Sequence, residues 1–225
     1  MKTKIFVILT VAVLSARNMQ AQFSLGVRGG FTLTQMSIDM DAKYLKMKPG
    51  FQIGVVGVYA LSDAFSVQSG ILYATQGCKV DAKTNFSHTQ LETKGTFNLN
   101  YIQIPVHAQY KIDLGGAKLL LQAGPYLGYG LGGKMKLTNL MDGVENKDDI
   151  KIKMGSGKDK PYRSFDFGLG AGAGLQFGSL QVALGYQMGF VDLINPKWME
   201  AQPIQVEASK IKNSALSLTL TYLFW

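Results

Sequence analysis

Acid–base chemistry in this sequence would have to rest on its two histidines, His88 and His107, because histidine is the side chain that titrates nearest neutral pH. A serine hydrolase also needs a serine and a carboxylate held beside the histidine. His88 lies in a polar stretch that fixes no such companions. His107 lies midway along an alternating segment, where a packed histidine is commoner than a base. We therefore predict no catalytic residue, and the chain is not expected to be an enzyme.

Metal and cofactor motifs are equally weak. The chain has one cysteine, Cys78, and no H-E-x-x-H sequence, so no metal site is expected. Gly128, Gly130 and Gly133 fit the G-x-G-x-x-G spacing of nucleotide-binding loops. They run from a predicted strand into a loop and not into a helix, so we reject phosphate binding there. No cofactor is expected.

Several charged and polar residues alternate with apolar ones, on the same side as glycines and glutamines. Arg28 and Asp166 are the two charges of this set that need a partner, because a buried charge without one is costly. We expect both to belong to one interior polar network. Separate hydration of the two charges is the alternative. The predicted members of the network, besides the neighbouring glutamines, are Arg28, His107, Lys118, Tyr126 and Asp166.

The segments that carry these residues have a period of two, which is the pattern of β-strands. In Arg163–Phe190, large apolar residues alternate with glycine and polar residues, and Gly178-Ser179 separates two arms. Such a two-residue break predicts a hairpin. Long arms that are apolar on one face and small or polar on the other suit a wall between lipid and a wet interior. A soluble β-sandwich or lipocalin-like barrel, with its apolar face inward, is the alternative.

Eight strands are predicted, and their connections alternate between long and short. The strands are Phe23–Leu33, Gly50–Leu61, Phe65–Gln76, Phe97–Ile112, Ala117–Leu131, Phe165–Phe177, Leu180–Phe190 and Ser214–Trp225. The long loops are residues 34–49, 77–96, 132–162 and 191–213. An even strand count with short turns at one end and long loops at the other is typical of a transmembrane barrel. The predicted fold is all-β, an eight-stranded antiparallel up-and-down β-barrel that crosses a membrane.

Outward-facing aromatic residues fall at two heights on the predicted strands, as in the interface girdles of membrane barrels. Those near the chain ends or the short turns are Phe23, Tyr59, Phe65, Tyr110, Phe177, Tyr222 and Phe224. Those near the long loops are Phe31, Phe51, Tyr73, Tyr129, Phe165 and Phe190. A lipocalin has no reason for this arrangement, so the aromatic residues favour the membrane barrel over the soluble one.

The amino terminus reads as a secretory signal peptide: Lys2 and Lys4 precede an apolar run of about ten residues, and small residues follow. Cleavage after Ala21 would divide the chain into a signal peptide, 1–21, and a barrel domain, 22–225. The formal net charge of +8 then falls by three, through loss of Lys2, Lys4 and Arg17. The remaining lysines are spread over the predicted loops and do not form one stripe, so we interpret them as solvated loop charges. Nucleic acid is not an expected partner of an exported chain.

The strand sequences resemble the outer-membrane β-barrel domain proteins of Bacteroidetes, the porin-family or PorT-like group. The segments that carry the resemblance are FSLGVRGGF, PGFQIGVVGVYALSDAFSVQSGILYATQG, LNYIQIPVHAQY, LLLQAGPYLGYGLGG, FDFGLGAGAGLQFG and SLTLTYLF. The resemblance implies residence in the cell outer membrane. It implies assembly by the barrel-assembly machinery through a terminal signal at Tyr222, Phe224 and Trp225. Members usually carry an acidic residue where Gly70 and Gln103 stand here.

Two classes of function remain for such a barrel. In the first, it is a structural or interaction protein whose loops 34–49, 77–96, 132–162 and 191–213 contact a surface ligand or a secretion-system protein, as the PorT-like resemblance permits. In the second, it is a narrow passive channel for small solutes. Few charges are predicted to face inward, which favours the first class. An outer-membrane lipid-modifying enzyme is a remote third alternative.

Overall fold

The computed structural model describes residues 22–38, 45–86, 89–141, 144–201 and 210–224, which form ten strands and one short helix. The predicted signal peptide, 1–21, lies outside the described residues. The elements are β1 (Phe23–Ile38), β2 (Leu45–Ala60), β3 (Phe65–Gln76), β4 (Cys78–Phe86), β5 (Thr89–Asp113), β6 (Lys118–Met141), β7 (Val144–Ile152), β8 (Phe165–Phe177), β9 (Leu180–Gly189), α2 (Pro196–Glu200) and β10 (Ile211–Leu223).

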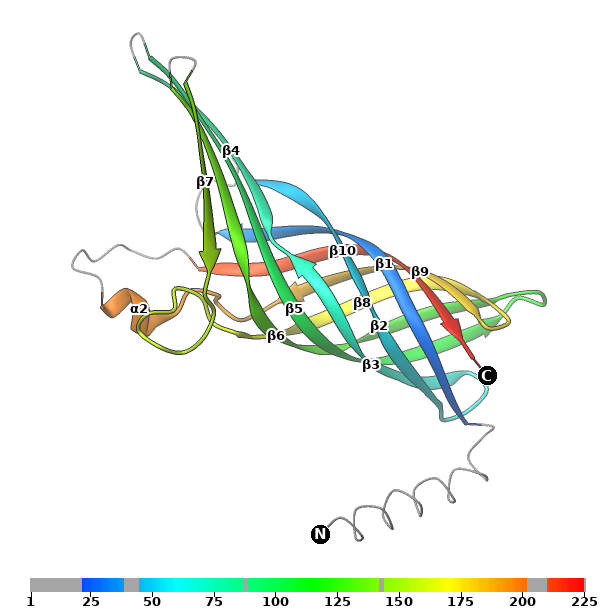
Figure 1. The fold of residues 1–225 in the computed structure, drawn as a ribbon. Helices are drawn as coiled ribbons and strands as arrows, with labels where there is room; N and C mark the ends of the chain where they lie inside the picture. Colours follow the sequence, from blue (N-terminus) through cyan, green and yellow to red (C-terminus); the bar gives the residue numbers. More distant parts are fainter. Residues whose placement is uncertain (1–21, 39–44, 87–88, 142–143, 202–209, 225) are drawn as a thin grey trace.

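Eight of the strands close into a ring, in the order β1, β2, β3, β5, β6, β8, β9 and β10, with every pair antiparallel. The closing pair joins the two ends of the chain, with Gly26 opposite Leu223. The ring strands lie tilted around a common axis (Figure 1). Closure leaves no unpaired edge in the ring, so its backbone groups are satisfied inside the sheet. The predicted eight-stranded antiparallel barrel is confirmed.

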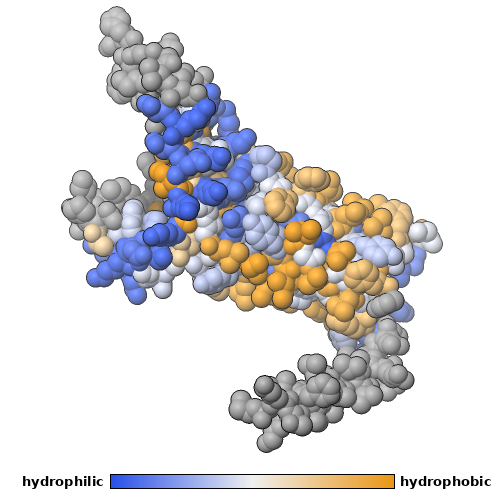
Figure 2. Space-filling view, in the orientation of Figure 1, coloured by the Kyte–Doolittle hydropathy of each residue, from blue (hydrophilic) through white to orange (hydrophobic). Residues whose placement is uncertain are grey.

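The wall of the ring has an apolar outside and a largely polar inside. On β10, Leu216, Leu218 and Leu220 are exposed, whereas Ser217, Thr219 and Thr221 are buried. Exposed apolar residues alternate with buried ones on the other ring strands too, although the buried set there includes the apolar Val56, Val58 and Leu72. Figure 2 shows hydrophobic residues over the barrel wall and hydrophilic residues at the end opposite the short turns. A soluble barrel would have the reverse polarity. The lipocalin-like alternative is therefore excluded.

Two of the four predicted loops are wrong in most of their length, because they continue as strands. Residues 78–86 and 89–96 form β4 and the start of β5, while residues 132–141 and 144–152 form the end of β6 and β7. Together they make a four-stranded sheet that projects beyond the ring (Figure 1), which we call the extension. The predicted loops 34–49 and 191–213 are also shorter than expected, because β1 reaches Ile38, β2 begins at Leu45 and α2 lies within the last loop.

A bulge marks the point where β6 leaves the ring. Tyr101 of β5 pairs with Gly130, but Asn100 pairs with Gly132, so Leu131 is the extra residue. Gly132 has φ +117°, in the left-handed region that favours glycine. Beyond the bulge, the residues of β6 that face outward and inward are exchanged. Lys134 therefore lies on the side of the sheet that continues the outer wall of the barrel. The apolar side chains after it lie on the side that continues the inner wall.

None of the described helices is long and apolar enough to cross a membrane.

Candidate functional site: the filled lumen and the sheet above it

The lower lumen, toward the short turns, is filled by a network of glutamine side chains that we call the glutamine network. Gln109 lies at its centre and donates from Nε2 to Oε1 of Gln68 and to Oε1 of Gln122, each over 3.2 Å. Gln68 in turn donates to Gln181 over 3.4 Å. Seven of the eight ring strands contribute to the network, whose members are Arg28, Ser66, Gln68, Gln109, Gln122, Gln176, Gln181 and Thr221.

Arg28 is held in this network by neutral partners. Its Nε donates to Oγ1 of Thr221 over 3.0 Å, and a terminal nitrogen donates to Oε1 of Gln68. The guanidinium is buried, so these hydrogen bonds replace part of the hydration that burial removes. Among the described residues no carboxylate forms an ion pair with Arg28, and Asp166 is not one of its hydrogen-bond partners.

Asp166 belongs to a separate group, which we call the acid cluster. Its Oδ2 accepts a hydrogen bond from Nδ2 of Asn213 over 2.9 Å and from the hydroxyl of Tyr126 over 3.2 Å. Asn213 also donates to the hydroxyl of Tyr101 over 3.4 Å. All four side chains are buried. Tyr126 is thus a partner of Asp166, but the hydrogen bonds of the acid cluster share no residue with the glutamine network. The predicted single network is thus two.

His107 and Lys118, the other two predicted network members, take part in the side-chain hydrogen bonds of neither group. His107 is buried and lines a cavity of about 20 Å³ together with Arg28 and Gln122, which has room for about one water molecule. Neither ring nitrogen of His107 has a hydrogen-bond partner in the described part of the chain. Lys118 begins β6 at the rim, half-buried and opposite Asp113.

Above the acid cluster, an apolar layer closes the mouth of the barrel. Leu99 and Leu193 are fully buried there, beside Cys78. Burial raises the pKa of the Cys78 thiol to about 11, so the thiol is protonated at neutral pH and a weak nucleophile. Six strands and two loops meet in this layer, which we call the mouth cluster. Its buried members are Met36, Cys78, Leu99, Tyr101, Ile152 and Leu193, with Val80, Phe97, Met135, Met154, Tyr162 and Ile211 packed against them.

One asparagine fastens the two loops that cover the mouth. Nδ2 of Asn195 donates to the carbonyl oxygens of Gly157 and Lys160, each over 2.9 Å, and of Gly155 over 3.3 Å. Its Oδ1 accepts from the backbone nitrogen of Lys197 and so begins α2. Asn195 is buried. Its role could not be predicted from the sequence, because an Asn-Pro step indicates only a turn.

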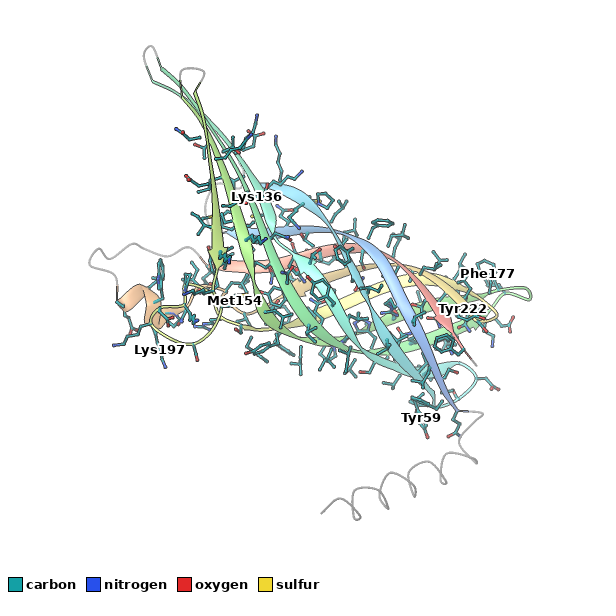
Figure 3. The ribbon with its side chains drawn as sticks, viewed as in Figure 1. Tyr59, Lys136, Met154, Phe177, Lys197 and Tyr222 are labelled. Carbon is teal, nitrogen blue, oxygen red and sulfur yellow. The ribbon has the colours of Figure 1, made fainter. Side chains whose placement is uncertain are left out.

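Lysines gather on the outer face of the extension, which we call the lysine face. The register places Lys134 directly opposite Lys151, and Lys136 opposite Asp149. Lys136 lies well away from the short turns in Figure 3. The interpretation of the lysines as scattered loop charges is therefore wrong for this group. The face consists of Lys79, Lys94, Lys134, Lys136, Lys147 and Lys151, with the acidic residues Asp81 and Asp149.

The predicted girdle aromatics lie on the outer wall. Tyr59, Phe177 and Tyr222 lie toward the short turns in Figure 3. Phe23 faces Tyr59 across the β1–β2 pair. Contact of these rings with the lipid interface stays a prediction. Exposed members are Phe23, Phe31, Phe51, Phe65, Tyr110, Tyr129, Phe165, Phe177, Phe190, Tyr222 and Phe224, and Tyr59 and Tyr73 are half-buried.

In the predicted assembly signal, the rings of Tyr222 and Phe224 are exposed and lie 5.9 Å apart, and Trp225 is outside the described residues.

Comparison with known families decides the identity of the fold. The family model for the outer membrane protein beta-barrel domain matches residues 16–195. The chain belongs to this family. The protein is therefore an integral β-barrel of the cell outer membrane, in agreement with its apolar outer wall. No curated protein sequence matches this outer-membrane barrel.

Solved structures similar to the outer-membrane barrel include three that cover most of it. Neisserial surface protein A is 13% identical with a TM-score of 0.40, over 88% of this chain and 96% of its own. Ail of Yersinia pestis is 14% identical with a TM-score of 0.37, over 90% of this chain and 99% of its own. OprG of Pseudomonas aeruginosa is 14% identical with a TM-score of 0.42, over 90% and 96%.

Proposed function

We propose that this outer-membrane barrel is a closed structural and interaction protein, which offers its extension and mouth loops to partners and does not conduct solutes. The observation that carries the proposal is the filling of the lumen by three successive groups of side chains. These are the glutamine network, the acid cluster and the mouth cluster. An eight-stranded barrel is just wide enough for side chains to fill it, so little room is left for a solute path.

A planar-bilayer conductance measurement tests this proposal. The refolded protein is added to a bilayer, with a diffusion porin as the positive control in the same membrane. We expect insertion without steady current, because opening a path would break hydrogen bonds that span the lumen. A stable open level carried by every inserted molecule would contradict the proposal and assign the barrel to the channel class.

A narrow passive channel is the second candidate, and the buried charges of the lumen favour it. Arg28 and Asp166 both face inward and neither has an oppositely charged partner among the described residues. A conduit would use such charges to select ions. Against this, the cavity that Arg28 and His107 line holds about 20 Å³, the space of about one water molecule.

We further propose that the barrel has no catalytic role. His107, the histidine best placed to act as a base, has no serine or carboxylate as a hydrogen-bond partner in the described residues. The partners we propose are outer-membrane lipid, the barrel-assembly machinery during biogenesis, and a surface ligand or secretion-system protein at the extension. The secretion role and the Bacteroidetes PorT-like assignment rest on the sequence resemblance of the strands.

A further inference from the structure

The lysine face carries like charges that its own sheet does not neutralise. Lys134 and Lys151 are exposed and directly opposite each other on β6 and β7. Like charges in directly opposed positions destabilise a sheet, and neither lysine has an acidic partner in the part of the chain that the structure describes. Lys136 has one, Asp149, at 3.9 Å and with both side chains about two-thirds exposed. The uncompensated pair is therefore a candidate site for an anionic partner from outside the chain.

The position of the lysine face indicates that its anionic partner belongs to the membrane surface. The bulge at Leu131 and Gly132 makes the face continuous with the lipid-facing wall, and Tyr129 and Leu131 are exposed on that wall directly below it. From Tyr129 to Lys134, five tilted strand residues rise on the order of 10 Å. This height is comparable with the polar headgroup layer of a bilayer. With Tyr129 at the lipid interface, as its predicted girdle position requires, Lys134 and Lys151 stand at the level of lipid headgroups.

We propose that the lysine face binds the phosphate groups of phosphorylated glycolipids in the outer leaflet, with Lys134 and Lys151 as the principal contacts. Anionic headgroups attract basic side chains beside a membrane, and two adjacent lysines can share one phosphate. The binding fixes the extension upright beside the barrel and relieves the repulsion between the two lysines. The proposal names a partner for the interaction role proposed above and rests on that role.

The test uses the folded full-length barrel in a neutral detergent, with bound lipid counted by native mass spectrometry. The protein is titrated with bisphosphorylated lipid A and, separately, with the dephosphorylated glycolipid of the same acyl chains. The variant is Lys134→Ala with Lys151→Ala. The matched control is Lys158→Ala with Lys197→Ala, which removes two exposed lysines from the mouth side but not from the lysine face. Heat-modifiability on an unboiled gel verifies that each variant is folded.

We expect the Lys134/Lys151 variant to bind bisphosphorylated lipid A about 25-fold more weakly than the parent, at roughly fivefold per lysine near an anionic surface. The control variant and the dephosphorylated glycolipid should show no such difference. In detergent without lipid A, the variant should be at least as stable as the parent, because one like-charge pair is gone. If the lysines had only a structural role, their substitution would change the stability of the barrel in the same direction with and without lipid A.

Three results would overturn the proposal. The first is equal binding of lipid A by the Lys134/Lys151 variant and the parent. The second is an equal loss in the control variant. The third is tighter binding of short polyphosphate than of lipid A, which would assign the face to a soluble polyanion.

The test of lipid binding and the test of the proposed function are separate measurements. Lipid is counted in detergent, and conductance is measured in a bilayer. A conducting barrel that still binds lipid A through these lysines would thus contradict the proposed function alone.

Discussion

At the scale of single residues, Asp166 shows what strand parity can and cannot predict. Alternation along β8 correctly placed its side chain inside the barrel, and likewise that of Arg28 on β1. Parity gives the face of a strand but not the height at which two inward residues meet, because that depends on the stagger of the strands around the ring. Arg28 therefore meets Gln68 and Thr221, and Asp166 meets Tyr126 and Asn213.

The hydroxyl of Tyr126 supports the first prediction at this scale. Tyr126→Phe removes one of the two side-chain donors to a buried carboxylate and changes nothing else in shape. We expect the free energy of unfolding to fall by about 1.5–3 kcal/mol, the range for a hydrogen bond to a charged group. Urea unfolding in lipid vesicles, followed by tryptophan fluorescence, measures it. Tyr186→Phe, at an exposed ring on the outer wall, is the control, and equal stabilities of the two variants would show that the acid cluster contributes nothing.

At the scale of elements, the ring strands were predictable and the extension was not. The predicted Phe65–Gln76 strand agrees with β3 at both ends, because a turn follows Ala60 and Gly77, with φ +141°, ends the strand. The fifth predicted strand stopped at Leu131, ten residues before β6 ends. Alternation does continue beyond it, but the bulge at Gly132 reverses its phase, so the segment no longer matched the outward pattern. The many lysines then made it look like a loop.

The loop fastening at Asn195 makes the second prediction. Asn195→Ala removes three hydrogen bonds to the 155–160 segment and leaves those carbonyl oxygens to water. Each of these hydrogen bonds contributes roughly 1 kcal/mol. The 155–160 segment should therefore open locally at least tenfold more often in the variant. Trypsin should then cleave after Lys158 at least tenfold faster in intact barrels. Asn146→Ala, at an exposed position of β7, should leave the cleavage rate unchanged. Equal rates in the parent and the Asn195 variant would mean that other contacts hold the loops.

As a whole, the molecule is a closed barrel whose outer face is apolar and whose inner face is largely polar, the reverse of a soluble barrel. Leucines and aromatic rings lie outside, while glutamines and the charged side chains of Arg28, Lys48 and Asp166 are buried inside. This polarity could be predicted from the sequence, since it needs only the strand count, the alternation and the two heights of aromatic residues. The filling of the lumen could not, because it depends on which inward side chains share a level.

The other conclusions depend on which face of the barrel wall contacts lipid. Spin-label accessibility in vesicles measures this for each face. Nitroxide labels are placed at Leu184 and at its neighbour Ala183 on β9, in a Cys78→Ser background. The label at Leu184 should collide freely with lipid-dissolved oxygen and be shielded from a water-soluble nickel chelate, because Leu184 is exposed on the apolar outer wall. The label at Ala183, which is buried in the structure, should be shielded from oxygen. A label at Leu184 that is shielded from oxygen, with the label at Ala183 open to the solvent or lipid outside, would contradict the account.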